Sequence, residues 1–100
     1  LAPINEAELN VTTHKLQLGM LLATPGAIEA VDGKDVADAL SRHAGGDWGE
    51  IPPDDVAENE LALKEGYRIH SSYTSSTGIR FWIITEADRS VTTVLLPDEY

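Results

Sequence analysis

Three short runs of alternating residues occupy the last third of the chain, and they constrain the fold more than any other feature. The runs are 67–74, 79–85 and 91–96, and the linker 75–78 contains only Ser, Thr and Gly. Successive residues of a strand point to opposite faces, and short linkers of this composition join antiparallel neighbours. The pattern predicts a three-stranded antiparallel meander that ends at Pro97, because proline cannot donate to a strand ladder.

The alternation also divides the residues of this meander between two faces. One face would be covered by helices, because its residues are large and apolar. They are Tyr67, Ile69, Tyr73, Ile79, Phe81, Ile83, Val91 and Leu95. The other, mixed face carries Arg68, His70, Ser72, Arg80, Trp82, Ile84, Thr92, Val94 and Leu96. Trp82, flanked by His70 and Val94, would form an apolar patch there if solvent reaches it. The predicted binding surface comprises Trp82, His70, Arg68 and Arg80.

The residues before the meander carry signals for an extended segment and for short helices. The run 16–23 predicts a strand or extended segment. A helix is predicted from Pro25 to Gly33, because proline suits the first helical position and glycine follows many helix ends. Two more helices are predicted. One covers about 35–43, with Asp35 as the cap, and the other starts within 52–55 and runs to about Glu65.

Together these segments predict an α+β fold. An N-terminal strand and two to three short helices would pack on the C-terminal three-stranded antiparallel meander. Residues 15–100 would form this single domain, which is large enough for one modest core. Residues 1–14 follow neither period and are expected to form a flexible N-terminal arm.

The composition narrows the classes of function. The chain has no cysteine, so a disulfide, a thiolate metal site and a cysteine nucleophile are excluded. Its seven basic residues are scattered among 17 acidic ones, and with a formal charge of −10 we expect no direct nucleic-acid binding. No apolar run approaches the roughly 20 residues that span a bilayer. A cytoplasmic location is expected, although a leader removed before Leu1 stays open.

The glycine-rich segment 42–49 is the first candidate for chemistry. In a functional interpretation, His43 is a base or ligand oriented by Asp47, and the glycines admit a ligand. In the structural interpretation, which we favour, His43 closes a helix and Trp48 fills the core. Asp47 would then bond loop amides, while Gly46 and Gly49 would adopt positive φ.

The segment 85–90 is the second candidate. Arg89 would suit a carboxylate or phosphate ligand, because a guanidinium binds both with paired hydrogen bonds. The alternative is a hairpin turn in which Asp88 bonds its own backbone. If both segments lie at one end of the fold, His43, Asp47 and Arg89 would share a cleft. The histidines lack metal-ligand spacing, so neither a metal nor another cofactor is expected.

Several stretches together resemble a group of small uncharacterised bacterial proteins that are often found on plasmids and integrated elements. The stretches are 23–27, 42–49, 58–60, 65–66, 85–90 and 92–97, and the resemblance covers roughly residues 16–100. It implies a bacterial, cytoplasmic setting on a mobile element, and it carries no established activity to this chain.

Two hypotheses of function follow. The first is a non-enzymatic protein-interaction module, indicated by the acidic balance and the mixed face with Trp82. One form would be an acidic inhibitor that mimics nucleic acid and occupies a host protein. The alternative is a small enzyme or ligand-binding domain that uses His43, Asp47 and Arg89. The oligomeric state stays open, since an exposed Trp82 face would also suit a homodimer.

Overall fold

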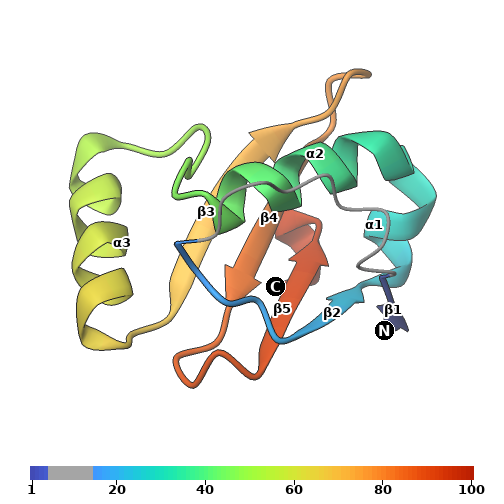
Figure 1. Cartoon of the computed structure of the whole chain (residues 1–100). Helices are drawn as coiled ribbons and strands as arrows, with labels where there is room; N and C mark the ends of the chain where they lie inside the picture. The colour runs from blue at the N-terminus through green and yellow to red at the C-terminus, as the bar shows by residue number, and fades with distance from the viewer. Residues whose placement is uncertain (5–14) are drawn as a thin grey trace.

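The computed structural model describes residues 1–4 and 15–100, and within them the chain has the predicted α+β fold (Figure 1). One mixed sheet contains five strands in the order β1-β2-β5-β4-β3. The strands are β1 (Ala2–Pro3), β2 (Met20–Ala23), β3 (Ile69–Thr74), β4 (Arg80–Thr85) and β5 (Val91–Leu95). The helices are α1 (Pro25–Ala30), α2 (Gly33–Ala44), α3 (Pro53–Glu65) and a 3₁₀ turn, η2 (Pro97–Glu99).

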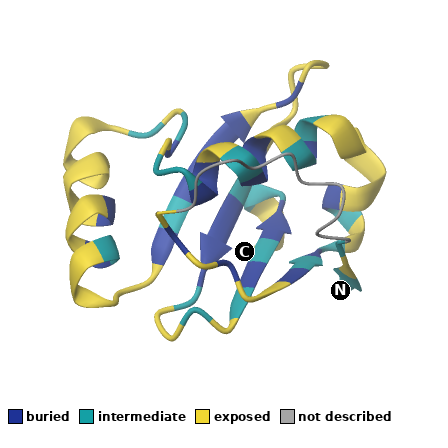
Figure 2. Ribbon diagram, in the orientation of Figure 1, coloured by how far each residue is buried: buried dark blue, intermediate teal, exposed yellow. Residues whose placement is uncertain are grey.

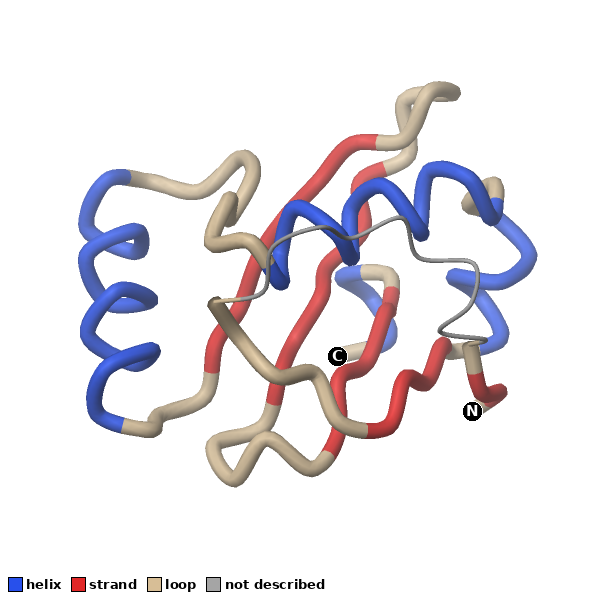
Figure 3. Tube along the Cα trace, in the orientation of Figure 1, coloured by secondary structure: helices blue, strands red, loops and turns tan. Residues whose placement is uncertain are grey.

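The predicted meander forms the centre of the sheet. Strands β3, β4 and β5 are antiparallel neighbours, and β2 joins the other side of β5 in parallel. The segment 16–19 is a loop, so β2 is shorter than the predicted strand (Figure 3). In place of a flexible arm, Ala2–Pro3 pair with β2, and Ile4 N donates to Leu21 O at 2.9 Å. The rest of the predicted arm, 5–14, lies outside the described residues.

Helices α1 and α2 cover one face of the sheet and form the core with it (Figures 1 and 2). The buried stripe of α2 includes Val36, Ala39, Leu40 and His43. These residues have the spacing of one helix face, as the sequence predicts. The helix begins earlier than predicted, at Gly33. This glycine was expected to end the first helix, but α1 already ends at Ala30. The cap of α2 is Asp32, whose Oδ1 accepts from Lys34 N at 2.8 Å. The predicted cap, Asp35, instead accepts hydrogen bonds from Ser76 N and Oγ.

Tyr67 and Ile79, which were predicted on the helix-covered face, precede β3 and β4 and are 56% and 37% exposed, so that part of the prediction is wrong. Within β3 and β4 the predicted faces are correct, but on β5 they are wrong. Ile83 pairs with Val94, so Val94 lies on the core face and is 0% exposed. Leu95 pairs with Trp82 on the mixed face, where Val94 was expected. The run from Val91 to Leu96 is apolar in both phases, so its own alternation leaves the phase undetermined. The register with β4 decides it, because a shift of one residue reverses every side chain.

Helix α3 stands beside β3, at the edge of the sheet, and is exposed along most of its length (Figures 1 and 2). Its two buried residues are Asn59 and Ala62. Asn59 Nδ2 donates to His70 O at 2.9 Å, and Asn59 Oδ1 accepts from His70 N at 3.3 Å. The amide side chain thus takes the place of a neighbouring strand, and it covers an edge that would otherwise be open to pairing.

Candidate functional site

His43 lies at the centre of a buried chain of hydrogen bonds. The residue is 0% exposed. Its Nδ1 lies 2.6 Å from Ser71 Oγ, and its Nε2 lies 2.8 Å from Thr85 Oγ1. Thr85 Oγ1 lies 2.7 Å from Thr92 Oγ1, which donates to Leu18 O at 2.6 Å. We call Ser71, His43, Thr85 and Thr92 the His43 chain.

The carbonyl of Leu18 sets the direction of every hydrogen bond in the His43 chain, because a carbonyl only accepts. Thr92 gives its one hydroxyl hydrogen to that carbonyl, and it therefore accepts from Thr85. Thr85 in turn accepts from Nε2–H of His43, which leaves Nδ1 to accept from Ser71 Oγ. A neutral imidazole fits this pattern. Burial lowers the pKa of His43 from 6.5 to about 3 and so keeps the ring neutral.

Ser71 and His43 are spaced like a nucleophile and its base, but both are 0% exposed. No substrate reaches the serine hydroxyl in this state. The remaining members of the His43 chain are threonines on β4 and β5 that satisfy one another. The His43 chain therefore ties α2 to the sheet.

Asp47 is held by Arg42 and by its own loop. Arg42 Nε and Nη2 donate to the carboxylate at 2.8 and 3.3 Å, and Gly49 N donates at 3.1 Å. The hydrogen bond from Arg42 lowers the pKa of Asp47. Gly46 and Gly49 have φ of +86° and +75°. A Cβ on Gly49 would lie 2.1 Å from Ser72 O, so only glycine lets the loop approach β3 this closely.

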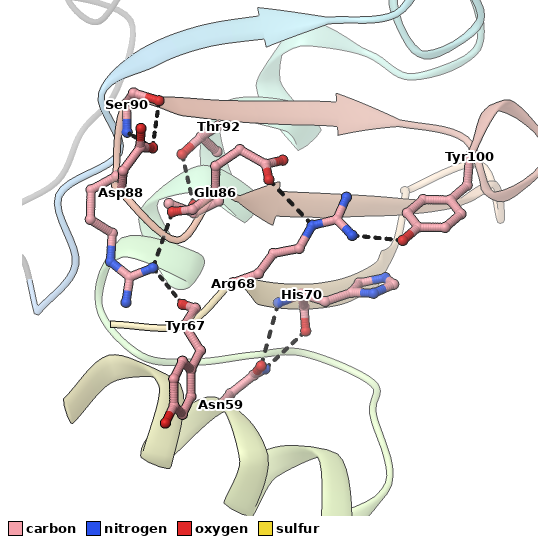
Figure 4. Close-up of polar contacts among 11 residues, drawn as sticks. Asn59, Tyr67, Arg68, His70, Glu86, Asp88, Ser90, Thr92 and Tyr100 are labelled. Carbon is pink, nitrogen blue, oxygen red and sulfur yellow. Dashed lines mark hydrogen bonds and ion pairs between the residues drawn. The ribbon is translucent and has the colours of Figure 1, made fainter. Parts of the chain in front are cut away.

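Trp48 and Asp88, the other two motif residues, also have structural contacts. Trp48 is 3% exposed, and its Nε1 donates to Glu60 Oε1 at 3.2 Å. Asp88 accepts from Ser90 N at 3.0 Å and from Ser90 Oγ at 2.6 Å, as predicted for a hairpin turn (Figure 4).

Arg89 binds backbone carbonyl groups. Its Nη1 donates to Tyr67 O at 2.6 Å and to Glu86 O at 3.2 Å, and its Nη2 donates to Ala62 O at 2.9 Å. The guanidinium thus satisfies carbonyls at and just beyond the end of α3. His43, Asp47 and Arg89 form no hydrogen bond with one another. The shared cleft that the enzymatic alternative requires is not formed by these three side chains.

A groove of about 590 Å³ lies between α3 and the mixed face of β3 and β4. We call it the α3 groove. All four residues of the predicted binding surface line it: Arg68, His70, Arg80 and Trp82. Helix α3 contributes the opposite wall with Asp55, Glu58 and Leu61. The sequence therefore indicated one wall of this groove, and the fold supplies the other.

Trp82 is held in place by rings on the mixed face. The His70 ring meets it edge-on with centroids 4.5 Å apart, and the Tyr100 ring does so at 5.8 Å. Arg68 lies over Tyr100, 5.3 Å from the ring centre, and its Nη1 donates to Tyr100 Oη at 2.7 Å (Figure 4). Arg68 Nε also lies 3.5 Å from Glu86 Oε1. Trp82 is half-buried, so part of its ring faces the groove.

The charged groups of the α3 groove are less completely paired than the neutral polar groups of the His43 chain. Arg80 Nη1 donates to Ser72 Oγ at 2.9 Å, and no carboxylate within the described residues forms an ion pair with it. Asp55 and Glu58 likewise have no ion-pair partner in that part of the chain. Burial and the nearby Arg68 lower the pKa of His70, so its ring is neutral at pH 7.

Sequence reasoning missed the α3 wall of the groove. Leu61 is 52% exposed and Tyr67 is 56% exposed, and both line the groove. The available signal was the helical spacing of α3, which groups Asn59 with Ala62 and Leu63 and leaves Leu61 on the opposite side. The structure buries Asn59 and exposes Leu61 accordingly. A helix that buries an amide and exposes a leucine leaves part of its apolar surface outside the core of its own fold.

No three His, Cys, Asp or Glu side chains among residues 1–4 and 15–100 are arranged to hold a metal ion. None of the helices in these residues has the length and hydrophobicity to cross a bilayer. Comparisons with models of protein families, with curated proteins and with solved structures find no match to this chain. The resemblance to plasmid-related bacterial proteins therefore stays a prediction.

Proposed function

We propose that this chain is a non-enzymatic protein-interaction module that binds a segment of another protein in the α3 groove. The observation that carries the proposal is the contrast in pairing. His43, Asp47 and Arg89 have internal hydrogen-bond partners, whereas the carboxylates of Asp55 and Glu58 in the groove have neither a hydrogen bond nor an ion pair within the described residues.

The shape of the groove supports the same function. Its volume of about 590 Å³ is similar to the roughly 300–1,000 Å³ of small-molecule sites, so the groove has room for side chains of an incoming segment. Trp82 lies in the groove wall with its orientation fixed by two neighbouring rings. Tryptophan and arginine are over-represented among the residues that dominate binding energy at protein interfaces. Exposed apolar side chains such as Leu61 would be buried by an incoming segment.

We further propose that the module acts in the bacterial cytoplasm as an acidic inhibitor that occupies a host protein. The resemblance of the sequence to mobile-element proteins supports this setting. A formal charge of −10 opposes direct binding to nucleic acid. It also makes a second copy of this chain an unfavourable partner, because like charges repel.

Photo-crosslinking from the groove tests the proposal. A photoreactive amino acid replaces Leu61, which lines the groove, or Ile28, which is 53% exposed on α1 and lies outside the groove. The expected result in bacterial cells is one major adduct from position 61 that position 28 does not give. Trp82→Ala, combined with the position 61 probe, should reduce this adduct at least several-fold.

Two outcomes would contradict the proposal. One is equal labelling from positions 61 and 28, which would show that the groove has no preferred partner. The other is an adduct from position 61 that survives Trp82→Ala unchanged. An adduct with twice the mass of the chain would replace the proposed partner with a homodimer.

A further inference from the structure

We propose that the occupant of the α3 groove is a basic segment, in which a Lys or Arg side chain pairs with Asp55 and Glu58 while an apolar neighbour rests on Leu61 and Trp82. This inference rests on the proposed function and names the chemistry of the partner. Asp55 and Glu58 are one helical turn apart on α3, and both line the groove.

The charge balance inside the groove favours a cation. Three carboxylates line it, from Glu50, Asp55 and Glu58, together with two guanidinium groups, from Arg68 and Arg80. Arg68 already lies 3.5 Å from Glu86 Oε1 and packs over Tyr100. The positive charge left without a carboxylate partner in the described residues is that of Arg80. His70 adds none, because it is neutral at pH 7.

Carboxylates and a guanidinium also lie on opposite walls of the groove. Asp55 and Glu58 belong to α3, whereas Arg80 begins β4 on the opposite wall and donates to Ser72 of β3. A partner with its basic side chain on the α3 wall therefore meets two carboxylates, and it can place a polar group near Arg80. Leu61, on the turn of α3 that follows Glu58, gives the stem of that basic side chain an apolar surface.

The electrostatic field of the whole chain also favours a cationic partner. Seventeen acidic and seven basic residues give a formal charge of −10, which attracts a cationic segment and repels an anionic one before contact. An acidic segment would have Arg80 as its main uncompensated partner and would approach against this field.

Three defined peptides of 12 residues test the inference. They share the same four apolar positions, including one Tyr, and carry either four Lys, four Gln or four Glu at the remaining variable positions. Amide chemical shifts of the labelled full chain are followed during titration at low salt. The Lys peptide should shift the amides of Asp55, Glu58 and Trp82, and its affinity should be at least tenfold higher than that of the Gln peptide.

A pair of double variants separates local pairing from the general field. Asp55→Lys with Glu58→Lys changes the charge inside the groove. Asp54→Lys with Glu65→Lys makes the same change in net charge on the same helix, but neither residue lines the groove. The first pair should lower the affinity for the Lys peptide at least tenfold, and the second pair should lower it no more than about threefold. The circular dichroism spectrum of each variant checks that α3 is retained.

Several results would overturn the inference. If the Glu peptide binds the groove most tightly, the partner is acidic and the interaction module itself stands. If both double variants weaken binding equally, the contact is long-range attraction and not recognition in the groove. If none of the three peptides shifts a groove amide, no basic segment of this kind is the occupant. The crosslinking result at position 61 then decides the proposed function separately.

Discussion

The His43 chain and the α3 groove are both polar clusters that contact β3, and they differ in how completely their polar groups are paired. Every hydrogen bond of the His43 chain ends within the protein, and no buried polar side-chain atom in the described residues lacks a partner. In the groove, Asp55, Glu58 and Arg80 have no ion-pair partner in those residues. Charged groups without a partner are available to a ligand, whereas polar groups whose hydrogen bonds are all formed within the protein are not.

In this protein, the type of a polar residue is a poorer guide to its role than its burial and its hydrogen-bond partners. His43 has the side chain most often associated with catalysis, yet its burial and its hydrogen bonds to the hydroxyls of Ser71 and Thr85 make it a connection between α2 and the sheet. Trp82 and Arg80 lie on β4 in no recognisable catalytic motif, yet they line an open groove. Pairing and exposure, more than residue type, separate the two clusters.

Removing the imidazole should give the largest loss of stability. His43→Ala leaves a cavity and deprives the hydroxyls of Ser71 and Thr85 of a partner. We expect the free energy of unfolding to fall by about 3–5 kcal/mol, measured by urea denaturation. His70→Ala removes the same side chain from the groove and should cost about 1 kcal/mol or less.

His43→Gln refines this test, because glutamine retains a donor and an acceptor and should recover part of the loss. If His43→Ala and His70→Ala cost the same, the His43 chain is not the structural connection described above, and the comparison with the groove fails.

Acidification should weaken the fold through the same residue. The unfolded chain binds a proton on His43 below about pH 6.5, whereas the folded state does not until about pH 3. The stabilisation is therefore complete above pH 6.5 and is lost as the pH falls towards 3. Between pH 7 and pH 5 the expected loss is about 2 kcal/mol, at up to about 1.4 kcal/mol per pH unit.

Urea denaturation at several pH values measures this slope. His43→Gln should remove most of it between pH 7 and 5, while the lowered pKa of His70 contributes a smaller slope of the same sign. Carboxylates with lowered pKa values, such as Asp47, add their own loss only at more acidic pH. An unchanged slope in His43→Gln would mean that another group carries the acid sensitivity.

Removing the amide that covers the sheet edge should have a moderate effect. Asn59→Leu keeps the volume but leaves His70 N and O without their partners on α3. We expect a loss of about 1–2 kcal/mol and faster hydrogen exchange at the His70 amide. Glu58→Gln, one residue away and directed into the groove, should change neither quantity. Unaltered exchange at His70 in Asn59→Leu would show that α3 does not seal the edge.

Breaking the loop ion pair should have the smallest effect. Asp47 and Arg42 are about half exposed, and exposed pairs of this kind contribute about 1 kcal/mol or less. Asp47→Asn should therefore lower the thermal midpoint by only a few degrees, as scanning calorimetry would show. A collapse of the fold in Asp47→Asn would place this residue with the His43 chain in importance.

The sequence predicted the class of structure well where local patterns are strong. The meander, the stripe of α2 and the faces of β3 and β4 follow from periodicity, and the structure has all of them. The wrong face on β5 and the wrong cap on α2 arose where two neighbouring residues fit equally well. Asp32 and Asp35 are both good caps, and Val94 and Leu95 are both apolar. Long-range contacts choose between such equivalents.

By itself, the sequence determined an acidic α+β chain with a meander and a mixed face that carries Trp82. Only the tertiary structure decided which polar residues remain available. It buried His43 against Ser71 and Thr85, and it placed α3 beside β3 so that Asp55 and Glu58 face Arg80 across a groove. The physical reason is that hydrogen bonds and desolvation depend on neighbours far apart in the chain, which no local pattern records.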